Sequence, residues 1–128
     1  MLTYMKDIQW AYNERAKAAK IISADILSQT MPVLVMGDFN DVGGSSAIKL
    51  LEKAGLKDAW WEGGFGYGAT IHKPLSYRID HIMYSSGLKL RKVEVASSED
   101  LSDHDALYAE LLYTYCVNVN DLLTSIMQ

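Results

Sequence analysis

Three short stretches of the chain gather carboxylate, amide and imidazole side chains. In the first, Asp38, Asn40 and Asp41 fall within four residues, directly after an apolar run at 33–36. A charged side chain that leaves water needs a partner, such as a metal ion, a histidine or a substrate. An Asx turn that closes a strand would explain the same residues without any chemistry. Taken alone, this stretch leaves both interpretations open.

The other two stretches each place an aspartate next to a histidine. They are residues 78–84, which contain Asp80, and residues 102–105, which contain Asp103 and His104. A carboxylate that accepts the imidazole proton fixes the histidine tautomer and favours the charged ring. Each candidate residue follows or lies within an expected strand, so together with the first stretch they could converge at one edge of a sheet.

The three stretches occur in a recognisable order. They read Gly-Asp-Phe-Asn at 37–40, Arg-Ile-Asp-His-Ile at 78–82 and Ser-Asp-His at 102–104. Each motif is weak alone, but through the ordered set residues 5–113 resemble the C-terminal half of a domain of the endonuclease/exonuclease/phosphatase superfamily. Its members are deoxyribonuclease-like, metal-dependent phosphodiesterases and phosphatases. The family's N-terminal half, with the glutamate that binds the metal, has no counterpart in this chain.

The resemblance implies a role for each candidate residue. Asp80 would be the partner of His104, which would contact the scissile phosphate, and Asp103 would bind the divalent metal. Asp38 would orient or deprotonate the attacking water, and Asn40 would hydrogen-bond a phosphate oxygen. A phosphate-ester substrate fits such a site, because its cleavage needs a positioned nucleophile and positive charge near the developing negative oxygens.

The cofactor that these residues favour is Mg²⁺ or Mn²⁺, because both are hard cations that prefer oxygen ligands. Zn²⁺ suits the sequence less well, since Cys116 and the three scattered histidines do not form a zinc cluster.

Several other polar residues have simpler interpretations. His81 is expected to be a structural strand histidine, because it faces away from the aspartate before it. His72 is expected at the surface, and Asp105 is expected to cap the turn before the last strand. Asp41 and Asp58 are expected to be turn and surface residues.

The hydrophobic periodicity predicts an α/β fold. Helices are expected over 4–29 and 46–54, and strands over 33–36, 78–84, 88–95 and 106–115. They would form one mostly antiparallel sheet of four or five strands, covered on one face by the two helices. The strand at 33–36 is expected to be buried on both faces. By resemblance, this arrangement is half of a four-layer α/β sandwich.

A glycine-rich stretch at 62–69 is expected to be a loop. It interleaves four glycines with Phe65 and Tyr67 and follows Trp60 and Trp61. Aromatic side chains on a loop could stack on a base or a sugar. They could also pack beneath the loop, which we favour because Trp and Phe are heavily buried on average.

Length and charge bound the organisation of the chain. Its 128 residues suit one domain, with the half-domain of a metal-dependent phosphoesterase over 1–115 and a tail over 116–128. The net charge of −4 argues against a wide basic surface for nucleic acid. The sequence shows no signal peptide and no apolar run long enough to span a membrane, and it leaves the localisation unknown.

The expected function is metal-dependent hydrolysis of phosphodiester or phosphomonoester bonds, incomplete in this chain. The missing N-terminal half would then be a partner, and the sheet face that it leaves uncovered could form a homodimer. The alternative is a catalytically silent fragment that binds phosphate-bearing ligands or self-associates. Nucleic acids, sugar or inositol phosphates and phospholipids all stay open as substrates.

Overall fold

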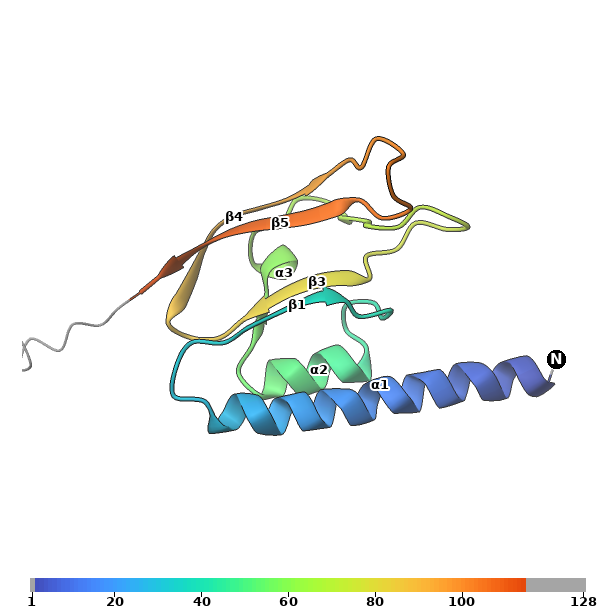
Figure 1. Ribbon diagram of the computed structural model, residues 1–128, viewed down its shortest axis with the longest axis horizontal. Coiled ribbons are helices and arrows are strands. Elements are labelled where there is room, and N and C mark those ends of the chain that lie inside the picture. The colour runs from blue at the N-terminus through green and yellow to red at the C-terminus, as the bar shows by residue number, and fades with distance from the viewer. Residues whose placement is uncertain (1, 115–128) are drawn as a thin grey trace, which may run out of the picture.

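The computed structural model describes residues 2–114, which form a mixed α/β fold (Figure 1). In chain order the elements are α1 (Leu2–Ser28), β1 (Leu34–Asp38), α2 (Ser46–Lys53), β2 (Lys57–Asp58), α3 (Ala59–Gly63), β3 (Asp80–Tyr84), β4 (Leu88–Ala96) and β5 (Ala106–Tyr113). The expected α/β class is confirmed. The predicted tail and Cys116 lie outside the described residues. Among the helices of residues 2–114, none is long and apolar enough to cross a membrane.

The strand pairs within residues 2–114 are antiparallel, in line with the mostly antiparallel sheet that was expected, but the strands divide into two hydrogen-bonded sheets. One sheet has the order β1-β3-β2, and the other is the hairpin of β4 and β5. The single sheet of four or five strands is therefore corrected to a sheet of three and a sheet of two. The hairpin stacks on the first sheet because Val93 of β4 packs with Ile82 and Tyr84 of β3, with α3 between them. These side chains are buried because the hairpin packs face to face on the first sheet. Hydrogen bonding along the edge of that sheet would not bury them.

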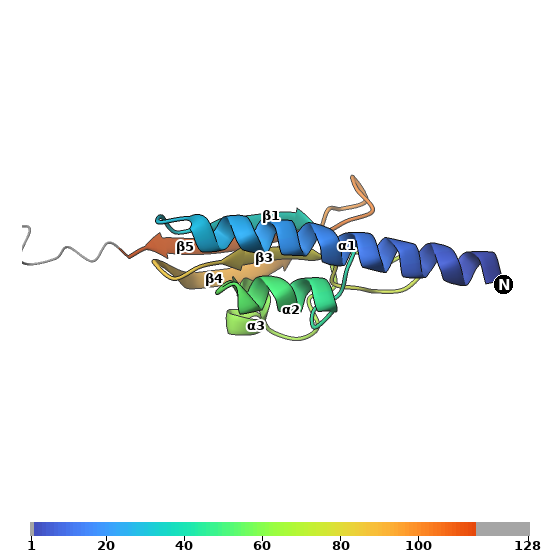
Figure 2. The ribbon, with the colours of Figure 1, turned by 90° about the horizontal axis from the view of Figure 1, so that it is seen from below.

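Two helices, α1 and α2, cover the opposite face of the three-stranded sheet, as expected (Figure 2). The core on this face combines Ala19 and Ile26 of α1 with Ile48 and Leu51 of α2 and Met83 of β3. The first half of α1 extends past the sheet, so part of the expected apolar stripe finds no partner there (Figure 1). The stripe contributes to the core only in the second half of the helix.

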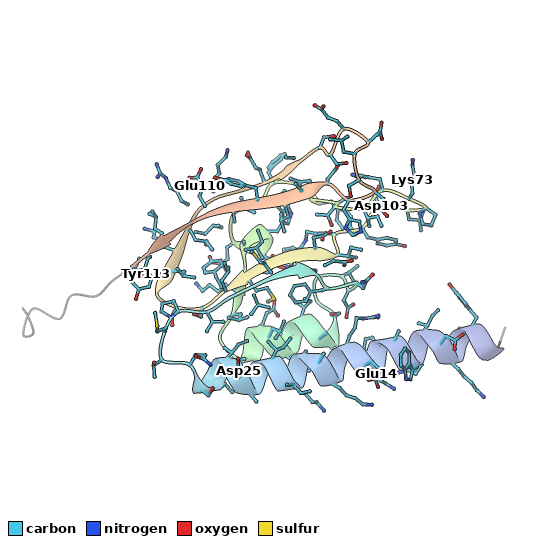
Figure 3. The ribbon with its side chains drawn as sticks, in the orientation of Figure 1. Glu14, Asp25, Lys73, Asp103, Glu110 and Tyr113 are labelled. Atoms are coloured by element: carbon cyan, nitrogen blue, oxygen red, sulfur yellow. The ribbon has the colours of Figure 1, made fainter. Side chains whose placement is uncertain are left out.

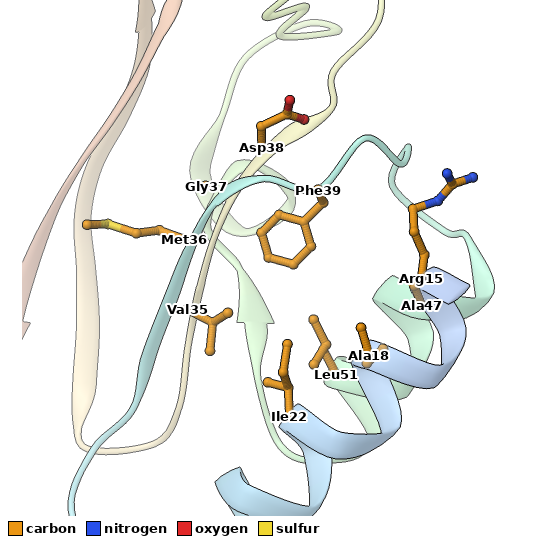
Figure 4. Close-up of a pocket in the computed structure, with 11 residues that line it drawn as sticks. Arg15, Ala18, Ile22, Val35, Met36, Gly37, Asp38, Phe39, Ala47 and Leu51 are labelled. Atoms are coloured by element: carbon orange, nitrogen blue, oxygen red, sulfur yellow. The ribbon is translucent and has the colours of Figure 1, made fainter. Parts of the chain in front are cut away.

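The prediction that the first strand is buried on both faces is wrong. Val35 and Phe39 point toward α1, whereas Met36 points to the other side of the sheet (Figure 4). On that side Leu34 is 45% exposed and Met36 is 67% exposed. The physical reason is position: β1 is the edge strand, and the β4–β5 hairpin packs over β3 instead.

Local signals mark both ends of α2. The Ser45 side chain accepts a hydrogen bond from the Ile48 N–H at 3.3 Å and so caps the first turn. After the helix, Gly55 adopts a φ of 100°, and Leu56 donates its N–H to the Leu51 carbonyl at 3.2 Å. This left-handed glycine followed by a buried leucine is a common way to end a helix.

A short helix that the sequence did not predict leads into the glycine-rich loop. Residues 59–63 form α3, a five-residue helix capped by the Asp58 side chain, which accepts from the Trp60 N–H at 2.9 Å. Trp60 packs beneath the loop as expected, but Trp61, Phe65 and Tyr67 are exposed. The prediction that the aromatic residues pack beneath the loop is therefore correct for Trp60 and wrong for the other three.

Candidate active site

Strand pairing brings two of the candidate carboxylates together. Asp38, the last residue of β1, is the register partner of Asp80, the first residue of β3. Directly paired residues of an antiparallel ladder project to the same face. Both carboxylates therefore lie on the face opposite α1 and α2, at the edge of the sheet where β1 ends and β3 begins.

His104 reaches this edge from the loop before β5. Its Nδ1 lies 2.7 Å from the Asp80 Oδ2, so the expected contact is present. A carboxylate oxygen accepts, so Nδ1–H donates. This hydrogen bond fixes the tautomer of the ring. The other nitrogen, Nε2, makes no hydrogen bond within residues 2–114.

The electrostatics of this edge favour a charged imidazole. The hydrogen bond to Asp80 raises the pKa of His104, against a smaller opposing effect of burial. The charges of Asp80, Asp38 and Asp103 act in the same direction. The negative charges of these carboxylates together help to hold a proton on the histidine.

Asn40 and Asp38 form a local turn. Asn40 adopts a left-handed φ of 49°, its backbone N–H donates to the Asp38 Oδ1 at 2.7 Å, and its Nδ2 donates to Oδ2 at 3.2 Å. These hydrogen bonds form the Asx turn that the sequence analysis gave as a structural explanation of these residues. It also fixes the orientation of the exposed Asp38 carboxylate.

Asp103 lies in the exposed loop between β4 and β5 (Figure 3). A carboxylate is a suitable ligand for Mg²⁺ or Mn²⁺. Within the described part of the chain, however, no group of three or more His, Cys, Asp or Glu side chains could hold a metal ion. The donors present are of the right kind but too few to form a complete site.

Thr70 is a structural residue that the sequence did not indicate. It is fully buried, and its hydroxyl accepts from the N–H groups of Ile79 at 3.3 Å and Asp80 at 3.2 Å. Its carbonyl accepts from the Asp105 N–H at 2.7 Å. Thr70 therefore joins the start of β3 to the segment that carries His104. No local pattern marks such a threonine, because its partners lie far away in the sequence.

His72 and Asp105 form a second histidine–carboxylate pair beside the first. His72 Nε2 lies 2.8 Å from the Asp105 Oδ2, and its side chain is 52% exposed, which agrees with the expected surface position. Asp105 also accepts from the Ser98 N–H at 2.9 Å, so it closes the loop before β5, as expected. Together with Thr70, this pair holds the loops at 70–77 and 98–105 against each other.

A buried polar network lies behind the site, and it corrects two predictions. Asp58, expected at the surface, is buried and accepts from Arg78 Nη1 at 2.8 Å. Asp41, also expected at the surface, is buried beneath α1 and pairs with Arg15 at 3.3 Å. Both are buried because each has an arginine partner, without which a buried carboxylate would be costly. Arg15 lies on α1, so only the fold could reveal that pair.

His81 belongs to this network and is structural, as expected. Its Nε2 donates to the Asp41 carbonyl at 2.9 Å. Its Nδ1 lies 2.8 Å from both Arg78 Nη1 and Asp58 Oδ2. A neutral ring accepts from Arg78, whereas a charged ring donates to Asp58.

The Asp58 carboxyl stays ionised within this network. Burial alone would raise the pKa of Asp58, but the hydrogen bonds and charges of His81 and Arg78 outweigh it and lower that pKa. Asp58 therefore balances the charge of the Arg78 guanidinium.

A cleft of about 300 Å³ between α1 and β1 reaches Asp38 of the candidate site at one end (Figure 4). Its walls are mostly apolar, including Ile22, Val35 and Leu51. The Asp38 carboxylate points away from the helices. The cleft is therefore a packing gap between helix and sheet.

Replacing Asp80 with asparagine should lower the pKa of His104 toward its ordinary value of 6.5, because the amide removes the charge that stabilises the imidazolium. NMR titration of the imidazole C–H signal measures this directly, and Asp25→Asn on α1 is the control. Since folding raises this pKa, the stabilisation is complete below pH 6.5 and is lost as the pH rises through the raised value. An unchanged pKa in Asp80→Asn would contradict the assigned pairing.

Comparison with known proteins gives a consistent result. No curated protein matches the sequence significantly. The fold is similar to an endonuclease/exonuclease/phosphatase from Bacteroides vulgatus, with a TM-score of 0.66, 25% identity and coverage of 77% of this chain and 44% of that chain. It is also similar to a mannosyl-6-phosphatase from Bacteroides thetaiotaomicron, with a TM-score of 0.61, 19% identity and coverage of 77% and 46%.

The chain thus spans less than half the length of either solved structure. The profile of the endonuclease/exonuclease/phosphatase family matches residues 10–104, which is most of the chain and includes all three motifs. This chain belongs to the endonuclease/exonuclease/phosphatase family.

Proposed function

We propose that residues 1–115 supply the C-terminal part of a site that hydrolyses phosphodiester or phosphomonoester bonds, with residues 116–128 as a tail. The observation that carries this proposal is the Asp80–His104 contact of 2.7 Å beside the Asp38–Asn40 turn. A phosphate ester can reach this edge, because Asp38 and Asn40 are exposed and His104 is partly exposed.

The geometry supports a distinct role for each residue. Asp80 fixes the tautomer of His104, so that Nε2 contacts the scissile phosphate as a charged hydrogen-bond donor. Asp38, held by Asn40, orients or deprotonates a water that attacks phosphorus, while the ester oxygen leaves with the electron pair of the broken bond. The Asn40 side chain then also hydrogen-bonds a phosphate oxygen.

Family members generally use divalent metals, and we propose Mg²⁺ or Mn²⁺ with Asp103 as one ligand. When bound, such a cation stabilises negative charge on the phosphate oxygens. The described residues contain too few ligands for a complete site, so the remaining ligands would come from the part of the family domain that this chain does not contain.

A second candidate is a catalytically silent chain that binds phosphate-bearing ligands or self-associates. The small number of metal ligands favours it. So does the exposed apolar face of β1, where Leu34 and Met36 lie uncovered. We propose that the missing part of the domain covers this face, and that the isolated chain buries it against a second copy.

The activity test uses the protein that contains both parts of the family domain. His104→Ala or Asp38→Ala should lower kcat by a factor on the order of 10² or more, because each residue acts in the transition state. Asp25→Ala, which changes an exposed aspartate on α1, is the matched control.

A panel of nucleic acids, phospholipids, inositol phosphates and sugar phosphates covers the substrate classes. Sugar phosphates are included because one structural neighbour is named a mannosyl-6-phosphatase. Activity within a few-fold of wild type in both variants would refute these roles, and the isolated chain should show little turnover.

Mg²⁺ should bind the isolated chain only weakly, with a Kd in the millimolar range or above, on the order of −4 kcal/mol. The reason is that a site of few carboxylates leaves most of the coordination shell to water. Isothermal titration calorimetry measures the affinity, with Asp103→Asn as the variant. Micromolar binding would mean that the chain builds a complete metal site by itself.

The isolated chain should be a dimer or an aggregate in solution, since an uncovered apolar sheet face is usually buried by association. Light scattering at micromolar concentrations measures the mass. Met36→Lys should shift the chain toward the monomer, whereas Leu75→Lys in an exposed loop should not. A soluble wild-type monomer of 14.3 kDa at all concentrations would be evidence against this proposal.

A further inference from the structure

The two members of the Asp80–His104 pair come from segments that belong to different sheets. Asp80 is the first residue of β3, and His104 lies just before β5, 24 positions later. Both strands start at the same end of the molecule (Figure 1), but no strand ladder within residues 2–114 joins β3 to β5. The contact of 2.7 Å between Asp80 Oδ2 and His104 Nδ1 therefore needs another connection that fixes the two backbones relative to each other.

Thr70 makes that connection through a single residue. Its hydroxyl accepts from the Asp80 N–H at 3.2 Å and from the Ile79 N–H at 3.3 Å. Its carbonyl accepts from the N–H of Asp105, the residue after His104, at 2.7 Å. The path from Asp80 through Thr70 to Asp105, and back through the His104 side chain, is therefore a closed ring in which every link between segments is a hydrogen bond.

The position of Thr70 is itself well fixed. The residue is fully buried, and branching at Cβ restricts its one side-chain torsion. On the other side of this segment, the N–H groups of Thr70 and Ile71 donate to the Tyr77 carbonyl at 2.8 and 3.0 Å. Ile71 also forms an isolated antiparallel bridge with His104. A residue that is held in this way can set the distance between the two segments that it joins.

A second connection between the same loops, the pair of His72 and Asp105, is weaker. The His72 side chain is 52% exposed, and exposed ion pairs contribute little because water and salt screen them. A buried hydrogen bond is electrostatically stronger than one in water. Thr70 is therefore the contact on which the spacing of the two segments chiefly depends.

We propose that Thr70 is a positioning residue for the hydrolytic reaction, because its hydroxyl and carbonyl together hold Asp80 against His104. Thr70 is fully buried and acts only through these two residues. Small displacements matter here, since a misplacement of about 1 Å can lower a rate by a factor on the order of 10². The catalytic consequence rests on the proposed function, whereas the effect on the Asp80–His104 contact stands on the geometry alone.

The test uses the protein that contains both parts of the family domain. Thr70→Val keeps the shape of the side chain but removes the acceptor for the Asp80 N–H, so kcat should fall about tenfold or more with little change in KM. Thr70→Ser restores the hydroxyl and should return kcat to within a few-fold of wild type. The matched control is Ser23→Ala, which removes a part-buried hydroxyl that donates to the Leu50 carbonyl at 3.2 Å and should leave kcat unchanged.

Two further measurements separate positioning from a general loss of stability. In the His104→Ala background, adding Thr70→Val should lower the residual kcat by no more than about twofold, because the residue through which Thr70 acts is gone. Crystal structures of the wild type and of Thr70→Val should show the distance from Asp80 Oδ2 to His104 Nδ1 lengthening beyond about 3.5 Å, out of hydrogen-bonding range.

An unchanged Asp80–His104 distance in Thr70→Val would overturn the proposal. An effect of Thr70→Val on kcat that is undiminished in the His104→Ala background would overturn it as well. So would a Thr70→Val protein that does not fold while Ser23→Ala does, because the hydroxyl would then serve the fold as a whole. If His104→Ala alone keeps its activity within a few-fold of wild type, the hydrolase roles fail and the catalytic consequence fails with them, whereas the measured distance still decides whether Thr70 positions the pair.

Discussion

The pairing of β1 with β3 is the constraint on which the rest of this structure depends. Its register sets Asp38 against Asp80 at one edge and places Val35 and Met83 on the face that α1 and α2 cover. A strand has two faces, so a slip of one residue would exchange them. Met83 would lose its core, and Asp80 would turn away from His104. The hydrophobic core and the polar edge are therefore specified by the same ladder.

Two sets of buried polar groups connect this ladder to the loops. Thr70 links the first residues of β3 to the segment before β5, and the Asp58–Arg78–His81 network links β3 to the loop after β1. Partly satisfied networks of this kind would be costly inside a protein, whereas satisfied ones fix a unique arrangement. The position of the Asp80–His104 contact is thus fixed by groups outside these two side chains.

Much of the local structure follows from the sequence. The capping of α2 by Ser45 and the left-handed Gly55 depend on neighbours within a few residues. The ordered motifs also indicated that Asp80 and His104 meet, although 24 positions separate them. Periodicity gave the helices that cover the sheet, because only the inward-facing positions need to be apolar.

The tertiary structure decided which side chains leave water. Asp41 and Asp58 look like surface aspartates until Arg15 and Arg78 are brought to them from distant segments. Trp60 and Trp61 are adjacent in the chain, yet one is buried and the other exposed, because only one faces the hairpin. The sequence by itself determined the elements and the chemistry of the candidate residues. Burial and sheet membership were decided only in the folded chain, because both depend on contacts between segments that no local pattern encodes.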